Sequence, residues 1–152
     1  MVDYSKRGHT VGFTVDFSEF DRYCLQYAEM QSEFEQFLRD FLTDMAWRVI
    51  KETVPKTPYR IGLLRNSWSI GDIHSNGKNL EIEIKNTAEY ATEVEFGHRG
   101  VYVPKLGVTL HTDTRWTNGH FMMTTSIENI QKQMPAKFEQ AFQNFLREHK
   151  LV

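Results

Sequence analysis

The feature that most constrains the fold is a stretch from about Glu29 to Thr53 whose apolar side chains recur every three or four residues. This period places them along one side of an α-helix. They are Met30, Phe34, Phe37, Leu38, Phe41, Leu42, Met45, Val49 and Ile50. Pro55 and Pro58 disfavour helical geometry in the residues before them, so we expect the helix to end near Thr53. At 1.5 Å per residue it would be on the order of 36 Å long and cross a whole small domain.

After the two prolines the apolar period changes to two, which is typical of strands. Trp68 and Ile70 alternate with serines, and Gly71 stands where a β-bulge is natural. A turn over 75–77 and a cleanly alternating strand over 80–85 complete a predicted hairpin. One face of this hairpin can receive the phenylalanine stripe, so we expect the stripe to pack in the core rather than fill a partner-binding groove.

Weaker patterns flank this centre. Alternation over 11–15 predicts a short strand, and Ser18 followed by an acidic residue three positions later predicts the start of a short helix. Residues 89–96 fit a strand or a helical turn, and we favour the helical turn. The segment after Asn118 predicts two helices or one broken at Pro135, which we place in a first turn.

Between these segments, residues of about 99–118 predict a protruding hairpin arm. Val101–Val103 faces Val108–Leu110 across a turn over 104–107. Together, the patterns predict one α+β domain over 1–152. Its sheet is mainly antiparallel with three or four strands, the long helix crosses one face, and the C-terminal helix lies beside it.

Composition limits which partners and cellular compartments the chain is suited to. The chain has 152 residues, with 18 Lys and Arg against 20 Asp and Glu, so its net charge of −2 gives no overall field that attracts nucleic acid or anionic membrane. Cys24 is the only cysteine, which favours a reducing compartment. No apolar run approaches the roughly 20 residues of a membrane span, and residues 1–10 are polar. We therefore expect a soluble cytoplasmic protein without a membrane partner.

The histidines and glutamates that could bind a metal or catalyse a reaction do not indicate any particular chemistry. His98, His111 and His120 lie in one stretch but lack the spacing that puts two imidazoles on one helical face, so we expect no metal. Glu93 and Glu95 diverge on a helical turn, and of the two we expect Glu95 to have a specific partner. Nucleophile and nucleotide motifs are lacking, so we expect neither a cofactor nor an enzyme.

Basic side chains gather in two places, at the end of the long helix and along the arm. They either form a solvated rim or contact DNA once several subunits surround a common axis. The candidates for DNA contact are Lys56, Arg60, Arg99, Lys105 and Arg115.

Two stretches resemble a known family. The run 57–68, TPYRIGLLRNSW, resembles the Pro-x-x-x-Gly-x-Leu-Arg-x-Ser stretch of the head-tail joining proteins, also called neck or tail-completion proteins, of long-tailed double-stranded DNA phages and prophages. Asn86 and the run 90–99, YATEVEFGHR, resemble their Tyr-Ala-x-x-Val-Glu-x-Gly segment, and the run 119–122, GHFM, resembles the small-residue and Phe element that opens their C-terminal helix. The resemblance covers roughly 10–148. This chain departs from the family at 60–61, where Arg-Ile replaces Asp-Thr before the motif glycine, so a cap from that Asp is lost or replaced.

The resemblance implies structural rather than catalytic roles for the motif residues. They are Pro58, Gly62, Leu64, Arg65, Ser67, Trp68, Tyr90, Ala91, Val94, Glu95, Gly97 and Phe121. We expect Gly62 to allow a tight reversal and Gly97 to release the chain into the arm. We expect Leu64 and Trp68 to pack under the sheet, and Glu95 to form a charge-assisted bond with Arg65.

The function implied by the resemblance is virion assembly. A ring of copies, six by analogy with the family, would join the tail tube or tail terminator protein to the head connector around the DNA channel. Such a protein would act in the host cytoplasm during assembly and then remain in the virion. We expect the arm to supply one ring surface through Tyr102, Leu106 and Trp116, with non-specific DNA contact also open. The alternatives are a bacterial or prophage-encoded interaction or regulatory module and, third, a small metal-dependent hydrolase.

Overall fold

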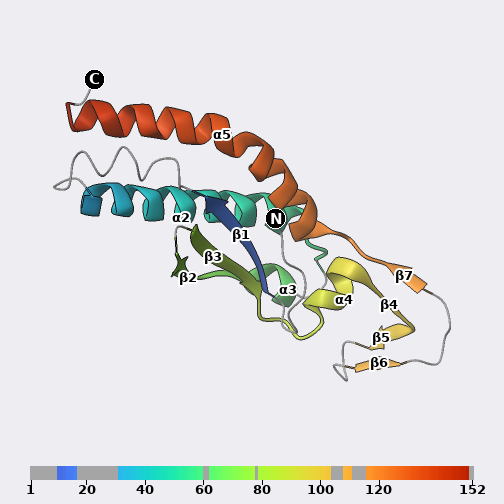
Figure 1. The fold of residues 1–152 in the computed structure, drawn as a ribbon. Coiled ribbons are helices and arrows are strands. Elements are labelled where there is room, and N and C mark those ends of the chain that lie inside the picture. Colours follow the sequence, from blue (N-terminus) through green and yellow to red (C-terminus); the bar gives the residue numbers. More distant parts are fainter. Residues whose placement is uncertain are drawn as a thin grey trace.

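The computed structural model describes residues 10–16, 31–59, 62–77, 79–103, 108–110 and 116–150. The helix expected from Ser18 lies outside these residues. The described elements, in chain order, are β1 (Thr10–Asp16), α2 (Gln31–Lys56), α3 (Leu63–Asn66), β2 (Trp68–Asn76), β3 (Asn79–Asn86), α4 (Ala91–Phe96), β4 (Gly97–Arg99), β5 (Val101–Val103), β6 (Val108–Leu110), β7 (Trp116–Asn118) and α5 (Met122–Glu148). Figure 1 shows α2 lying between the sheet and α5.

The long helix α2 confirms the first prediction but ends three residues later than expected. Pro55 lies inside its last turn, where it removes one hydrogen bond from the helical ladder and its ring crowds the carbonyl of Lys51. The next turn still closes, because Thr57 N donates to Thr53 O at 3.0 Å and Thr57 Oγ1 donates to the same oxygen at 2.9 Å. Pro58 follows, and the helix does not continue beyond it.

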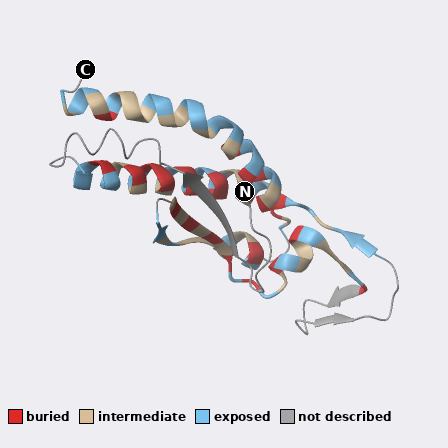
Figure 2. Ribbon diagram, in the orientation of Figure 1, coloured by how far each residue is buried: buried red, intermediate tan, exposed pale blue. Residues whose placement is uncertain are grey.

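A three-stranded antiparallel sheet, in the order β1-β3-β2, carries the hairpin that the alternation predicts. The register of β2 on β3 shifts between Ile70 and Ile73, so Gly71 occupies the predicted bulge. Alternate residues of β3 are buried, with Ile82 and Ile84 at its centre. These side chains join the buried face of α2 in one core (Figure 2).

The phenylalanine stripe of α2 packs in the core as predicted, but its rings meet α5. Phe37 lies 4.9 Å from Phe145 between ring centroids, and Phe41 lies 5.1 Å from Phe138 in an edge-on arrangement. Of the two alternatives for the C-terminal segment, the structure has one helix, which curves in Figure 1 and contains Pro135 in its interior. The placement of Pro135 in a first turn was wrong. A proline within a helix removes one ladder bond and bends the axis.

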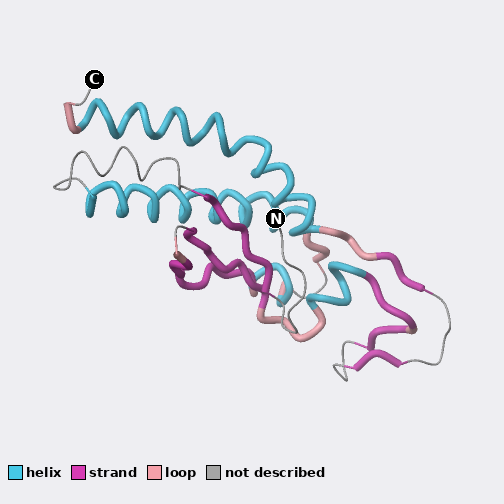
Figure 3. The backbone as a smooth tube through the Cα atoms, in the orientation of Figure 1, coloured by secondary structure: helices cyan, strands magenta, loops and turns pink. Residues whose placement is uncertain are grey.

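The arm consists of two short antiparallel ribbons that project from the body (Figures 1 and 3). At its base β4 pairs with β7, with Arg99 opposite Trp116. Further out β5 pairs with β6, which confirms the predicted hairpin; its turn at 104–107 lies outside the described residues. Among the described helices, none combines the length and the apolar character that crossing a membrane requires.

Candidate functional site

The base of the arm is held by a carboxylate placed at the start of α5. Glu95, at the end of α4, is only 4% exposed. Its Oε1 accepts hydrogen bonds from Thr124 N at 2.8 Å and Thr124 Oγ1 at 2.7 Å, and its Oε2 accepts one from Met123 N at 3.1 Å. The first N–H groups of a helix lack partners within the helix, and the helix dipole favours a negative charge there. Glu95 therefore acts as the N-terminal cap of α5 from another element.

This contact corrects one prediction and confirms another. Glu95 does have a specific partner, but the partner is the start of α5 and not Arg65. The Arg65 guanidinium instead donates to Thr57 O, from Nη2 at 2.7 Å and from Nε at 3.3 Å. It also lies 5.2 Å from the centroid of the Tyr59 ring. Both groups lock local structure, although each does so with a partner that the resemblance did not indicate.

Backbone contacts reinforce the junction between α4 and α5. His120 N donates to Val94 O at 2.8 Å, and Phe121 N donates to Glu95 O at 3.0 Å. Gly97 has a φ of +88°, as expected for the residue that turns the chain into the arm. A Cβ on Gly119 would lie 2.8 Å from Gly97 N and would overlap the carbonyl of Glu95. The two strands of the arm therefore leave the body with their backbones in direct contact.

A second cluster of polar contacts surrounds Thr57, which is buried at the end of α2. Its hydroxyl accepts a hydrogen bond from Trp68 Nε1 at 3.0 Å. Pro58 is partly buried, and Gly62, with a φ of +80°, precedes α3 as the predicted reversal. Ser67 Oγ donates to Leu63 O at 2.7 Å. The first motif thus fastens the end of α2 to the start of the sheet.

Leu64 does not pack under the sheet as expected. It is buried in a separate cluster with Ala88, Ala91 and Met122, because α3 faces α4 and the start of α5. Trp68 is partly buried against both clusters, and Tyr90 and Val94 pack against this second one. Asn86 connects the two regions, since its Nδ2 donates to Leu64 O at 2.7 Å and its Oδ1 accepts from Ala88 N at 3.0 Å.

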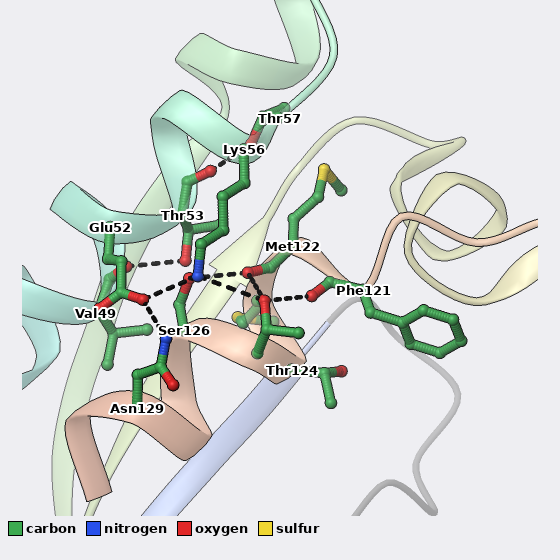
Figure 4. A network of polar contacts seen from close by, with 12 residues as sticks. Val49, Glu52, Thr53, Lys56, Thr57, Phe121, Met122, Thr124, Ser126 and Asn129 are labelled. Atoms are coloured by element: carbon green, nitrogen blue, oxygen red, sulfur yellow. Dashed lines mark hydrogen bonds and ion pairs between the residues drawn. The ribbon is translucent and has the colours of Figure 1, made fainter. Parts of the chain in front are cut away.

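A third network, drawn in Figure 4, joins the last turns of α2 to the first turns of α5. Lys56 Nζ lies 2.7 Å from Glu52 Oε1 and 3.1 Å from Ser126 Oγ, and Asn129 Nδ2 donates to the same Glu52 oxygen at 2.7 Å. Hydrogen bonds from Lys56 and then from Asn129 lower the pKa of Glu52. Lys56 therefore contacts α5 of its own chain, and its predicted contact with DNA stays a prediction.

The remaining predicted residues divide between exposed positions and positions that the structure leaves undescribed. Trp116 and Arg99 are exposed at the base of the arm. Outside the described side chains lie Arg60, Tyr102, Lys105, Leu106 and Arg115.

Sequence reasoning missed several members of these networks. Thr57 and Asn86 stood in the resembling stretches but carried no predicted role, and Ser126 and Asn129 were not singled out. Asn86 alone carried a usable signal. It continues the buried alternation of β3, and a polar side chain at a buried position needs a hydrogen-bond partner.

No cluster with the form of a metal centre occurs in the described part of the chain, where His, Cys, Asp and Glu form no group of three or more suited to an ion. His98 Nδ1 is buried and has no hydrogen-bond partner there. The three networks instead join α2, α3, α4 and α5 at one end of the body, from which the arm projects (Figure 1). The Glu95 network holds the arm base to α5, while the other two networks join the end of α2 to α3, β2 and α5.

One comparison with known proteins gives a match. A family model named HK97-gp10-like, with the description "Bacteriophage HK97-gp10, putative tail-component", matches residues 19–97, just over half of the chain. The match includes α2, the hairpin and α4, and ends at the glycine where the arm begins. The searches of curated proteins and of solved structures give no match.

Proposed function

The chain belongs to the HK97-gp10-like family of phage tail components, and from this premise we propose that it joins the tail to the head connector as one subunit of a ring around the DNA channel. A tail component is a structural part of the virion. We further propose that the ring contains six copies of the chain and that it contacts the head connector directly. Its immediate partners would be copies of itself, the tail tube or tail terminator protein, and the head connector.

The observation that carries this proposal is an arm that projects from the body and is held at its base. Glu95 holds the arm base to α5 through three hydrogen bonds, while Trp116 on the arm is 54% exposed. A closed ring needs head-to-tail contacts, so each subunit must present two different surfaces that fit each other. An arm held at its base and projecting from one end of the body supplies one such surface. No bond has to form or break for this role.

A DNA contact inside the channel is a secondary part of the proposal. Arg99 is exposed on the arm base, and the sequence adds Lys105 and Arg115 on the same arm. A single subunit has a net charge of −2 and would attract DNA only weakly. Several copies that place these side chains around one axis would add their charges along the phosphate backbone.

The test removes the outer arm and leaves its base intact. Residues 101–114 are replaced by a short Gly-Ser turn, which keeps β4, β7 and the Glu95 contact. Phage or prophage particles assembled with this variant should contain unattached heads and tails by electron microscopy, while circular dichroism of the purified variant shows a folded body. Adding wild-type protein to the extract should restore joining. Normal joining by the folded variant would reject the arm as an assembly surface.

A further inference from the structure

Two of the seven asparagines of the chain are followed directly by glycine, Asn76 before Gly77 and Asn118 before Gly119. Asparagine is a thermolabile residue, and the next backbone nitrogen attacks its side-chain amide most readily when that nitrogen belongs to glycine, which has no Cβ to hinder the approach. The two pairs have the same sequence, so a difference in their reactivity must come from the fold. One lies at the hairpin turn and the other at the base of the arm.

Asn76 lies at an open hairpin turn. It ends β2 and pairs with Asn79 of β3, and both Asn76 and Gly77 are exposed. Gly77 has a φ of +64°, and beyond its chain neighbours no heavy atom lies within 4 Å of a Cβ built on it. Among the turn and loop hydrogen bonds between described residues, none is donated by Gly77 N. This nitrogen is therefore unhindered, and only fraying of the hairpin tip is needed for it to approach the Asn76 amide.

Asn118 is also exposed, but the backbone around it is held on both sides. It pairs with Gly97 in the ladder of β4 and β7. A Cβ built on Gly119 would overlap the carbonyl of Glu95 and lie 2.8 Å from Gly97 N. The two residues after Gly119 donate their N–H groups to backbone oxygens of α4, at 2.8 and 3.0 Å. The backbone at Asn118 can therefore rotate into the reactive geometry only after the arm base opens.

We propose that Asn76 is a site of spontaneous deamidation in the folded protein, and that the closed arm base protects Asn118 from the same reaction. The Gly77 amide nitrogen bonds to Cγ of Asn76 and loses its proton, which leaves with the side-chain nitrogen as ammonia when the Cγ–Nδ2 bond breaks. The product is a cyclic succinimide. Water then opens this ring. Attack at Cγ yields aspartate, and attack at the backbone carbonyl carbon yields isoaspartate, whose chain runs through Cβ and Cγ.

The same products would have different consequences at the two positions. Each product adds one negative charge, and isoaspartate also inserts one carbon atom into the main chain. The turn at Gly77 has room for this carbon, whereas at Asn118 the strand would shift against Gly97, where the two backbones leave no room for a methyl group. Figure 1 shows the turn between β2 and β3 on the side of the sheet away from the arm, so the two reactions do not influence each other. The contacts that hold the arm base therefore also protect its main chain chemically.

The test measures both reactions in one sample. The purified full chain is incubated at mildly alkaline pH, and the peptides that contain Asn76 and Asn118 are quantified over time by mass spectrometry, with isoaspartate identified by enzymatic methylation. The same protein in urea gives the rate of each site without the fold. Folding should keep the Asn76 rate within about fivefold of its unfolded value and slow the Asn118 rate by about fiftyfold or more. Equal protection of the two sites, or stronger protection of Asn76, would overturn the inference.

Two variants test whether the arm base is what protects Asn118. Glu95→Gln weakens the cap on α5, and Gly97→Ala places a Cβ 2.8 Å from Gly119 N, so both make opening easier without changing the Asn–Gly pair. Each should speed deamidation at Asn118 about tenfold and leave Asn76 unchanged, and circular dichroism shows which variants retain the folded body. Glu89→Gln, at an exposed position before α4, is the control and should change neither rate. A wild-type Asn118 rate in the folded variants would overturn the protective role of the arm base.

Discussion

Glu95 and Thr124 meet through two hydrogen bonds to one carboxylate oxygen, from the Thr124 backbone N at 2.8 Å and from its hydroxyl at 2.7 Å. Glu95 lies in the last turn of α4 and Thr124 in the first turn of α5, so this contact joins the family-matched body to the helix beyond the arm. The arm leaves the body between them. A loss of this contact should therefore loosen the arm before it unfolds the main core.

Glu95→Ala should lower the free energy of unfolding by about 2–4 kcal/mol, because it leaves buried N–H groups of Met123 and Thr124 without an acceptor. Glu95→Gln keeps one acceptor oxygen but loses the charge at the helix start, and should cost about 1–2 kcal/mol. Glu89→Ala, at an exposed position, is the control. Urea unfolding measures all three. Equal stability of Glu95→Ala and wild type would show that the cap does not hold the junction.

The hydroxyl of Thr57 and the indole of Trp68 form a pair suited to a double-mutant cycle. Thr57→Val keeps the shape but leaves Trp68 Nε1 without its acceptor, and should cost about 1–3 kcal/mol. In a Trp68→Phe background the same change should cost less, with a coupling of about 1 kcal/mol or more. Thr57→Ser retains the hydroxyl and serves as the control. Additive losses would mean that the hydrogen bond contributes nothing.

Two glycines allow a comparison of steric and conformational costs. At Gly119 a Cβ would overlap the backbone of Glu95 and come within 2.8 Å of Gly97 N, whereas at Gly77 nothing lies within 4 Å. Gly77 has a φ of +64°, so Gly77→Ala should cost about 1 kcal/mol from backbone strain alone. Gly119→Ala requires the arm base to separate and should cost more. Hydrogen exchange should show the difference, with faster exchange at β4 and β7 in Gly119→Ala only.

Periodicity predicts the body of this fold because each pattern follows from local geometry. The three- and four-residue spacing around Phe41 can only place those side chains on one side of a helix, and the alternation around Ile82 can only build one face of a strand. Gly71 was predictable as a bulge for the same reason. The end of α2 was placed too early because the proline rule takes no account of Thr53 and Thr57, whose hydroxyls donate hydrogen bonds to the backbone oxygens of Val49 and Thr53 around Pro55.

The partners within the candidate site were harder to predict, because they lie far apart in the chain. Glu95 and Thr124 are separated by 29 positions, and Glu52 and Asn129 by 77. No spacing rule connects such residues. The presence of Glu95 and Arg65 in two motifs suggested an ion pair between them. The start of α5 binds the Glu95 carboxylate instead, because its first N–H groups have no acceptor within the helix. The order of the motifs indicated the family. The hydrogen bonds between distant residues could be identified only in the folded structure.

The Glu52 network makes a prediction about pH. Hydrogen bonds from Lys56 and Asn129 lower the folded-state pKa of Glu52, so the unfolded state binds its proton more readily. The resulting stabilisation is fully present above the unfolded pKa of about 4.3 and is lost as the pH falls through the lower folded value. Because Glu52 is partly exposed, with 28% of its side chain accessible, this stabilisation should be at most about 1 kcal/mol.

The variant that isolates this effect is Glu52→Gln, which retains an acceptor for Lys56 and Asn129 but cannot ionise. Its deficit in unfolding free energy relative to wild type should be constant from pH 7 down to about pH 5 and then shrink as Glu52 becomes protonated. Glu35→Gln changes a more exposed i,i+4 pair on the same helix and should show a smaller deficit. Denaturation midpoints measured at several pH values separate the two. A Glu52→Gln deficit that grows on acidification would contradict the direction of the pKa shift.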